Sequence, residues 1–286
     1  METNFGGNGM LFKGITAVSV AAALLECLRI ELTAMPMVLL FIGNFCGWFA
    51  VLTLAALVFL FVVCALVDLK KEQEQDSKFY RAIMYVYIEA LMNLMLIRLH
   101  TEGLEKTPKE GRFLLVCNHL FLADPGILLH AFKKSQLAFI SKKENMDIPI
   151  INKFMHKILC QMLERDNDRQ ALKVILKCIQ LIKEDQVSVG VFPEGYTSKD
   201  GKLHPFRSGV FKIAQKANVP IVVCTIQGTR EMFRNVKRLK RTDVHLHLVE
   251  VIPAEELKGK TTVEIGERVY ERMIADLGEE WRYIEQ

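Results

Sequence analysis

Hydrophobic residues are concentrated in the first third of the chain, and the longest run covers residues 36–67. None of the 32 residues in this run is charged. A straight helix of that length would extend about 48 Å, whereas the hydrocarbon core of a bilayer is about 30 Å thick. The pattern predicts either one tilted membrane span with an apolar lead-in or two shorter helices that break near Gly43, Asn44 and Gly47.

The segments around this run predict a membrane anchor. Gly43 and Gly47 form a GxxxG pattern, which either lets two helices approach closely or only marks a bend. Residues 15–25 are also apolar, but charged residues follow too soon for a full span, so we expect an interfacial helix. Two lysines directly after the long run favour a cytoplasmic location for the rest of the chain. We therefore expect residues 1–75 to anchor the chain in the cytoplasmic membrane.

A second apolar stretch, residues 79–99, follows a short polar boundary and contains interspersed charges. The pattern predicts a helix that lies either on the bilayer or on the following domain. We assign it as an interfacial helix at the start of that domain.

From residue 111 onward, short apolar runs alternate with helix-like stretches. The runs that read as strands are 112–118, 137–141, 187–192, 220–226 and 244–251. The stretches that read as helices are 125–133, 149–163, 168–184, 208–217 and 261–277. The alternation predicts an α/β domain over residues 76–286, with a mixed sheet flanked by helices, behind an N-terminal membrane helix or helical hairpin. Ligands of such domains bind at the loops that follow the strands.

The first of these strands runs into the sequence CNHLFLADPG, residues 117–126. Asp124 suits a helix N-cap and Pro125 suits the first helical position, so a loop separates the strand from a helix. His119 and Asp124 then lie across that loop and can face one cleft. A histidine held by a carboxylate is a general base with a fixed tautomer. The alternative is a loop histidine beside an ordinary helix cap.

Composition and motifs narrow the classes of function. The formal charge of +4 fits an anionic membrane surface or phosphate-bearing ligands. The seven cysteines contain no CxxC pair and indicate buried thiols rather than disulfides or a zinc site. His245 and His247 share one strand face, but no cysteine or carboxylate pattern completes a metal site. Dinucleotide-binding, serine-hydrolase and P-loop patterns are absent, and no motif supports nucleic-acid binding.

Four sequence blocks follow one another between residues 118 and 226. They are NHLFLADP, the segment 141–167 that ends in ERDN, VFPEGYTS, and VPIVVCTI. This ordered set resembles the lysophosphatidic acid acyltransferases, also called 1-acylglycerol-3-phosphate acyltransferases, of the HX4D type. The resemblance implies transfer of a fatty acyl group from acyl-CoA or acyl-ACP to the sn-2 hydroxyl of 1-acylglycerol 3-phosphate. The product would be phosphatidic acid, made in phospholipid biosynthesis without a cofactor or metal.

The resemblance also implies roles for individual residues. His119 matches the catalytic base and Asp124 its orienting partner, while N–H groups near the helix start at 125 would stabilise the oxyanion. The positions expected to bind the phosphate of the acceptor or to shape its site are Lys142, Lys143, Arg165, Glu194 and Gly195.

One block departs from the family pattern. The family commonly has FPEGTRS, whereas this chain has Tyr196 and Thr197 after Gly195 and lacks the arginine. Arg207, on the same segment, is the expected substitute. The departure leaves the acceptor open to glycerol 3-phosphate, another lysophospholipid or an amino-acid lipid. The alternative outside this chemistry is a non-catalytic lipid-binding membrane protein.

A basic stretch, residues 234–241, has no place in the four blocks. It predicts contact with anionic lipid headgroups, contact with the phosphates of coenzyme A or an acyl-carrier protein, or a solvated face.

Overall fold

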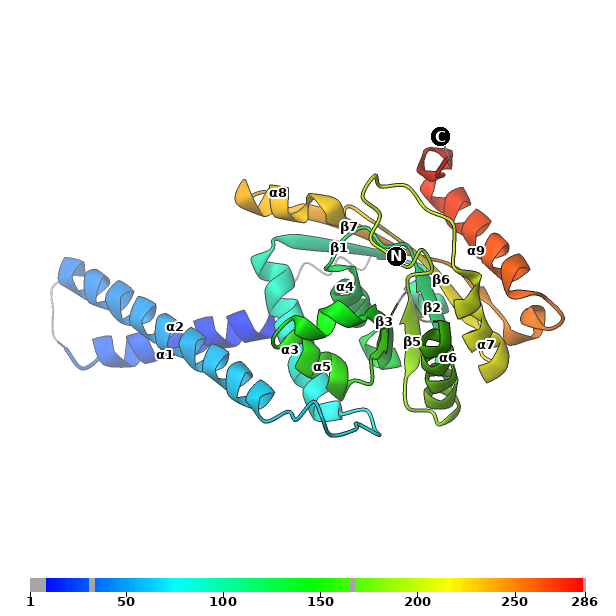
Figure 1. The fold of residues 1–286 in the computed structure, drawn as a ribbon. Helices are drawn as coiled ribbons and strands as arrows, with labels where there is room; N and C mark the ends of the chain where they lie inside the picture. The colour runs from blue at the N-terminus through cyan, green and yellow to red at the C-terminus, as the bar shows by residue number, and fades with distance from the viewer. Residues whose placement is uncertain (1–8, 31–33, 165–167, 285–286) are drawn as a thin grey trace.

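The predicted strands meet in one seven-stranded sheet at the centre of the molecule, ordered β1-β7-β6-β2-β5-β3-β4. The computed structural model describes residues 9–30, 34–164 and 168–284 (Figure 1). The strands are β1 (Ile97–Glu102), β2 (Leu114–Cys117), β3 (Leu137–Lys142), β4 (Gln161–Leu163), β5 (Ser188–Val191), β6 (Ile221–Gln227) and β7 (Thr242–Ile252). The predicted mixed sheet flanked by helices is confirmed.

The direction of the strands places several loops at one edge. β2 pairs in parallel with both β5 and β6, and β3 pairs in parallel with β5 and β4. β7 is antiparallel to β6, and β1 is parallel to β7. The carboxyl ends of β2, β3, β4, β5 and β6 therefore face the same edge, with β2 in the middle of the sheet.

Helices cover both faces of the sheet. Alternate residues of the strands belong to two hydrophobic clusters, for example Leu115 and Cys117 to one and Leu114 and Val116 to the other. The first cluster is completed by α3 (Lys78–Leu94), α4 (Asp124–Ala131) and α5 (Ile151–Lys157). The second is completed by α6 (Asp168–Lys183), α7 (Lys212–Ala217) and α9 (Thr262–Leu277). The central strands are buried on both sides, which is why they read as continuous apolar runs.

Three short elements differ from the sequence prediction. β1 begins at Ile97, inside the predicted helix 79–99, because the chain turns at Leu96, where φ is +54°. β4 occupies the end of the predicted helix 149–163. α8 (Met232–Lys237) lies in the β6–β7 connection, where no helix was predicted. Each is too short for hydrophobic periodicity to identify it.

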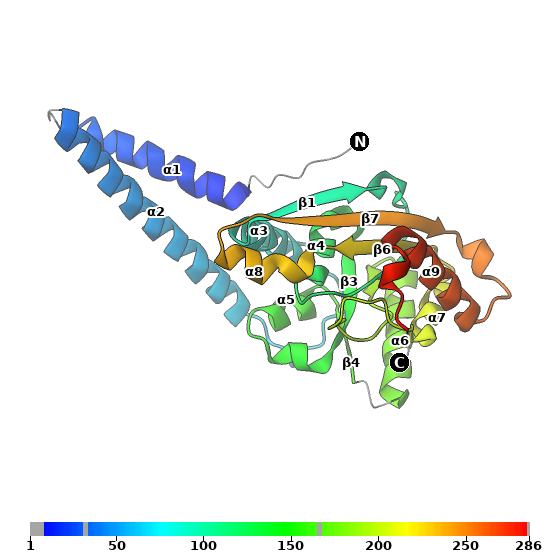
Figure 2. The ribbon, with the colours of Figure 1, turned by 90° about the horizontal axis from the view of Figure 1, so that it is seen from above.

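The N-terminal part forms a helical hairpin that projects from the domain (Figure 1). α1 (Met10–Cys27) and α2 (Ala34–Ala65) are both long and apolar enough to cross a membrane. They pack against each other at the end far from the domain and diverge toward it (Figure 2), and the indole of Trp48 donates to the Glu26 carboxylate at 2.9 Å. The interfacial helix predicted over 15–25 is therefore one arm of a hairpin, which the sequence missed because of the charge at residue 26.

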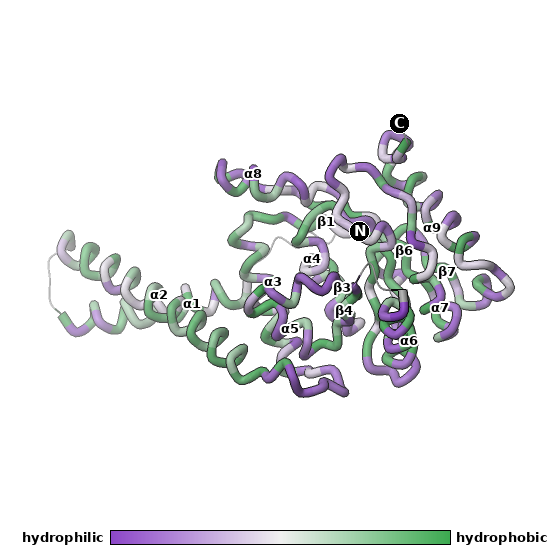
Figure 3. The backbone as a smooth tube through the Cα atoms, viewed as in Figure 1, coloured by the Kyte–Doolittle hydropathy of each residue, from purple (hydrophilic) through white to green (hydrophobic). Residues whose placement is uncertain are grey.

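α2 decides between the two interpretations of the long apolar run. It is one continuous helix of 32 residues, so the predicted alternative of two helices broken near Gly43 and Gly47 is wrong. A side chain added at either glycine would meet no atom within 4 Å. The GxxxG pattern therefore makes no close helix contact with another described residue. Figure 3 shows that most of α2 is coloured as hydrophobic residues.

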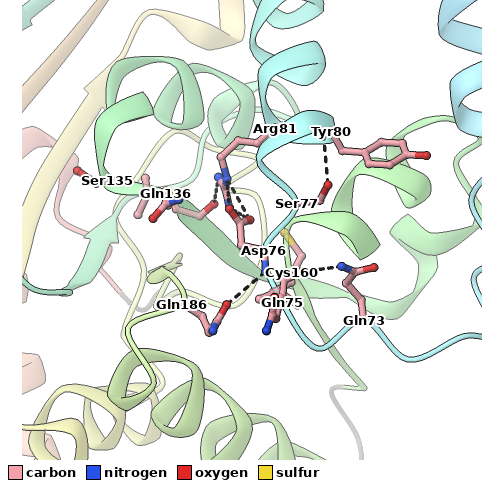
Figure 4. Close-up of polar contacts among 12 residues, drawn as sticks. Gln73, Gln75, Asp76, Ser77, Tyr80, Arg81, Ser135, Gln136, Cys160 and Gln186 are labelled. Atoms are coloured by element: carbon pink, nitrogen blue, oxygen red, sulfur yellow. Dashed lines mark hydrogen bonds and ion pairs between the residues drawn. The ribbon is translucent and has the colours of Figure 1, made fainter.

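α3 joins the hairpin to the sheet, and a buried ion pair fixes its start (Figure 4). Nε of Arg81 donates to Asp76 at 3.0 Å, and its Nη1 donates to the carbonyl of Leu137 at 2.8 Å. Both charged side chains are almost completely buried. Met84 lies in the core beneath the helix. The helix therefore covers the sheet as part of the domain, while side chains such as Phe79 and Leu94 are exposed, and its assignment as an interfacial helix stays a prediction.

Candidate active site

The site begins where the central strand β2 ends. Asn118 follows the last strand residue and is buried. Its side-chain oxygen accepts the N–H of Ile226 at 2.7 Å, and its side-chain nitrogen donates to the carbonyl of the same residue at 2.9 Å. This pair of bonds ties the start of the loop to β6. A buried polar residue needs such partners, and they fix where the next residue points.

His119 and Asp124 meet across the loop, as predicted. Nδ1 of His119 lies 2.9 Å from Oδ2 of Asp124, and the same oxygen accepts the N–H groups of Leu120 and Phe121, each at 2.7 Å. The aspartate side chain is completely buried, whereas the histidine ring is 16% exposed. The carboxylate therefore shapes the loop and holds one ring nitrogen, while part of the imidazole stays exposed.

Asp124 differs in one detail from the prediction. It is the first residue of α4 rather than the N-cap, a position that Ala123 occupies. Its carboxylate reaches back to the loop N–H groups and the histidine instead of capping the helix, and its Oδ1 has no partner among the described residues. This buried carboxylate bonds to a histidine ring and two backbone N–H groups of the loop, so it stabilises the loop rather than the start of the helix.

A stack of aromatic rings packs against one face of the His119 ring. The ring of Phe192 lies 4.2 Å from that of His119 and inclined by 21°, and Phe139 stacks on Phe192 at 5.4 Å. His119 and Phe192 follow β2 and β5, and Phe139 lies within β3, so the stack joins three neighbouring strands. Phe192 packs on the face of the imidazole and Asp124 bonds to its edge at Nδ1. The two contacts together restrict the rotation of the ring.

Glu194 is buried behind the histidine loop and does not face an open site. Its Oε1 accepts the N–H of His119 at 2.9 Å, and its Oε2 accepts the N–H of His204 at 3.0 Å. Burial raises the pKa of Glu194 to about 7, although the two backbone hydrogen bonds lower it. The carboxylate joins two loops through their backbones, and the acceptor-shaping role expected from the sequence stays a prediction.

Gly195 and Arg207 are brought together by the turn after β5. Gly195 has φ of +78°, and a side chain there would lie 3.0 Å from Nε of Arg207. The N–H of Arg207 donates to the carbonyl of Pro193 at 2.8 Å, and the N–H of Ser198 donates to that of His119 at 2.8 Å. The turn thus places an exposed guanidinium against a glycine next to the histidine loop.

The other predicted cations lie farther along the same edge. Lys142 ends β3, two strands from β2, which corresponds to about 10 Å at ~4.8 Å per strand. Lys143 is exposed and forms an ion pair with Glu164 at 2.7 Å. Arg165 lies outside the described residues, directly after Glu164. The structure therefore brings His119, Asp124, Glu194, Gly195 and Arg207 together, whereas Lys142 lies farther along the same edge of the sheet.

Sequence reasoning missed two contributors, Asn118 and Phe192. The only signal for Asn118 was a polar residue at the end of a buried strand. Phe192 carried no signal, because an aromatic residue at the end of an apolar run reads as core.

Comparison with known proteins identifies the class and then the family. The sequence profile of the Acyltransferase family matches residues 98–227, which span β1 to β6 and include every site residue above. The chain is similar to a probable 1-acyl-sn-glycerol-3-phosphate acyltransferase of Mycoplasma pneumoniae, at 31% identity over 193 residues. That alignment covers 65% of this chain and 71% of the relative. The chain belongs to the 1-acyl-sn-glycerol-3-phosphate acyltransferase family.

A further relative and a solved structure are also similar to the chain. A 1-acyl-sn-glycerol-3-phosphate acyltransferase of Borreliella burgdorferi is 25% identical over 173 residues, which cover 59% of this chain and 68% of the relative. The crystal structure of the 1-acyl-sn-glycerophosphate (LPA) acyltransferase PlsC from Thermotoga maritima superposes with a TM-score of 0.60 at 24% identity. It covers 79% of this chain and 89% of that chain, and shows the same fold.

Proposed function

We propose that this enzyme transfers a fatty acyl group from a thioester to the free sn-2 hydroxyl of 1-acylglycerol 3-phosphate, with His119 as general base and Asp124 as its orienting partner. The observation that carries the proposal is the 2.9 Å contact between Nδ1 of His119 and the buried carboxylate of Asp124. With Nδ1 held, Nε2 accepts the proton of the attacking hydroxyl, and the carboxylate stabilises the imidazolium that forms.

The chemistry needs no nucleophile from the protein. The hydroxyl oxygen forms a bond to the thioester carbonyl carbon as its proton passes to Nε2 of His119. The carbon–sulfur bond then breaks, and the leaving sulfur takes that proton back from the imidazolium. Cys117 is buried beside the loop and its pKa is raised well above its usual value by burial, which makes it a poor competing nucleophile.

The oxyanion requires N–H donors near the start of α4. The N–H groups of Leu120 and Phe121 are already bonded to Asp124, and Pro125 has none. Gly126 is the next amide in the first turn, with open space around its Cα. The N–H groups in the first turn of a helix lack partners within the helix. We assign those at the start of α4 as the donors to the oxyanion.

Cations at the edge of the sheet would hold the phosphate of the acceptor. Arg207 is exposed beside Gly195, and its planar guanidinium can donate to two phosphate oxygens at once. Lys142 approaches the same region from β3. Tyr196 is 38% exposed where the family pattern has a smaller residue, so its ring is positioned to influence which acceptor binds.

The hairpin attaches the enzyme to the membrane that holds its lipid substrates. α1 and α2 run in opposite directions, so both ends of the hairpin return to the domain. The lysines after α2 favour the cytoplasmic face for the domain. The donor would be acyl-CoA or acyl-ACP.

Acyl transfer from long-chain acyl-coenzyme A to 1-acylglycerol 3-phosphate tests the proposal, in detergent with His119→Ala beside the unaltered enzyme. Phosphatidic acid formed by the enzyme and lost in the variant is the expected result. A variant that retains activity would refute the assignment of the base. Glycerol 3-phosphate and other lysophospholipids run in parallel, and a preference for one of these would reassign the acceptor.

A further inference from the structure

The connection between β6 and β7 exposes apolar and basic side chains together. It consists of α8 and residues 238–241, and we call it the α8 surface. Phe233 is 53% exposed and Leu239 is 86% exposed. Large apolar side chains with this degree of exposure in one short segment mark a contact surface.

The cations of the α8 surface are free to bind a ligand. Arg234 pairs with Glu231, but the remaining basic side chains are exposed and form no ion pair with a described residue. They are Lys237, Arg238, Lys240 and Arg241. Four uncompensated cations in five positions produce a strongly positive local potential, which attracts an anionic partner.

The α8 surface lies on the same side of the domain as the hairpin. In both ribbon views α8 lies at the end of the domain from which the hairpin projects, and its C-terminal end points toward that side (Figures 1 and 2). The N–H of Thr242 donates to the carbonyl of Leu96 at 3.0 Å, so the end of α8 lies beside the end of α3. Leu91 and Leu94 of α3 are exposed there at 57% and 64%.

The same surface touches the catalytic loop. The rings of Phe121 and Phe233 pack edge to face with centroids 5.0 Å apart. Phe121 lies between His119 and Asp124, and its neighbour Leu122 is 59% exposed. The α8 surface and the tip of the histidine loop thus form one continuous apolar and basic area.

From these observations we infer that the α8 surface is a second membrane contact, separate from the hairpin, and that it binds anionic phospholipid headgroups. The four cations meet headgroup phosphates, while Phe233 and Leu239 insert at the interface between headgroups and acyl chains. The contact seats the histidine loop at the level of the headgroups. A membrane fits better than a protein partner because the cations and apolar side chains accompany a membrane anchor on the same side.

Site-directed spin labelling of the full chain in vesicles tests this inference without relying on catalysis. A nitroxide is attached to Leu239→Cys, with Cys46→Ser to remove the exposed cysteine of the hairpin. Val263→Cys, 54% exposed at the start of α9, is the matched control on the far side of the domain. Accessibility to oxygen and to a water-soluble nickel complex is measured in phosphatidylcholine vesicles with and without phosphatidylglycerol.

The expected result is a several-fold higher ratio of oxygen to nickel accessibility at 239 than at 263, present only with phosphatidylglycerol. Replacing the four cations by glutamine should remove it, whereas Lys258→Gln with Lys260→Gln should not. Equal ratios at 239 and 263 would overturn the inference, and so would an effect of the same size without phosphatidylglycerol. Protection from nickel at 239 in detergent alone would assign the surface to a second copy of the chain instead.

Discussion

The carboxylate of Glu194 holds His119 through its backbone, by a hydrogen bond of 2.9 Å from the histidine N–H. Its second oxygen holds the N–H of His204 in the same way. The position of the proposed base therefore depends on three independent contacts: this bond, the Asp124 carboxylate and the Phe192 ring. Of the three, only the Asp124 contact is a hydrogen bond to a nitrogen of the imidazole ring.

Glu194→Gln should lower kcat more than it raises the acceptor KM. An amide has one oxygen, so one of the two backbone N–H groups loses its acceptor and the histidine loop shifts. We expect kcat to fall about 10- to 100-fold, as for the displacement of a catalytic group. Steady-state kinetics measure the split. A large rise in KM with unchanged kcat would instead support the acceptor-shaping role that the sequence suggested.

The raised pKa of Glu194 predicts a pH dependence of stability. Its pKa is about 7 in the folded chain and near 4.5 in the unfolded chain, so the folded state holds this proton more tightly. Its contribution is fully present below pH 4.5 and is lost as the pH rises through 7. The difference corresponds to about 3 kcal/mol. Thermal unfolding at pH 5 and pH 8 should show a larger fall in Tm for the unaltered enzyme than for Glu194→Gln, and equal falls would contradict this.

Asp124→Asn should preserve the fold but reduce kcat about 10³-fold, or about 4 kcal/mol in transition-state stabilisation. The amide can still accept the loop N–H groups, but it no longer carries the charge that stabilises the imidazolium. Asp243→Asn is the matched control, because Asp243 holds His100 at 2.8 Å on the surface of the sheet. Activity of the control should stay within about twofold. Comparable losses in both variants would remove the special role of Asp124.

Asn118→Ala should destabilise the domain by about 2–4 kcal/mol, because it leaves the buried N–H and carbonyl of Ile226 without partners. Activity should fall as well, since the residue directly precedes His119. Chemical unfolding measured beside turnover checks both effects. A variant with normal stability would show that water or a shifted backbone satisfies Ile226.

Arg207→Ala should raise the KM for the phosphate-bearing acceptor about tenfold and leave the KM for the thioester donor unchanged. Lys143→Ala is the comparison, because that lysine is exposed and already paired with Glu164. A smaller effect is expected there. If the two variants were equal, Arg207 would not be the cation that replaces the missing arginine of the family pattern.

Arg81→Ala should cost about 3–5 kcal/mol of stability, because it leaves the carboxylate of Asp76 buried without its partner. Arg98→Ala removes an exposed pair with Asp243 and should cost less than about 1 kcal/mol. Thermal unfolding of the two variants measures the contrast. Equal shifts in Tm would mean that water replaces the guanidinium of Arg81.

The layer architecture and the His119–Asp124 contact could be predicted from the sequence because both depend on strong local patterns. Strands buried on two faces produce continuous apolar runs, and a proline after an aspartate marks the start of a helix. β1 could not be found in this way. Its residues alternate in burial at the side of the sheet, and the apolar segment before it is a true helix that obscures the boundary.

The role of Glu194 could not be predicted either, because a motif gives the residue and not the direction of its side chain. Its partners, the N–H groups of His119 and His204, are 75 and 10 positions away. Likewise, the chain beyond Cys27 gave no indication that α1 would fold back along α2. That arrangement depends on contacts between the two helices, and such contacts leave a much weaker signal in the sequence than hydrophobic periodicity does.

The buried pair of Arg81 and Asp76 has a mechanical consequence for the enzyme. It fastens the segment that leaves the membrane to β3, one of the strands that ends at the active-site edge. The domain is also held to the hairpin directly, because the hydroxyl of Tyr80 in α3 donates to the carbonyl of Val63 in α2 at 3.2 Å, so its orientation follows that of the hairpin. A change in bilayer thickness that tilts α2 would rotate the catalytic edge with it, so lipid composition would adjust turnover without any ligand binding to the domain.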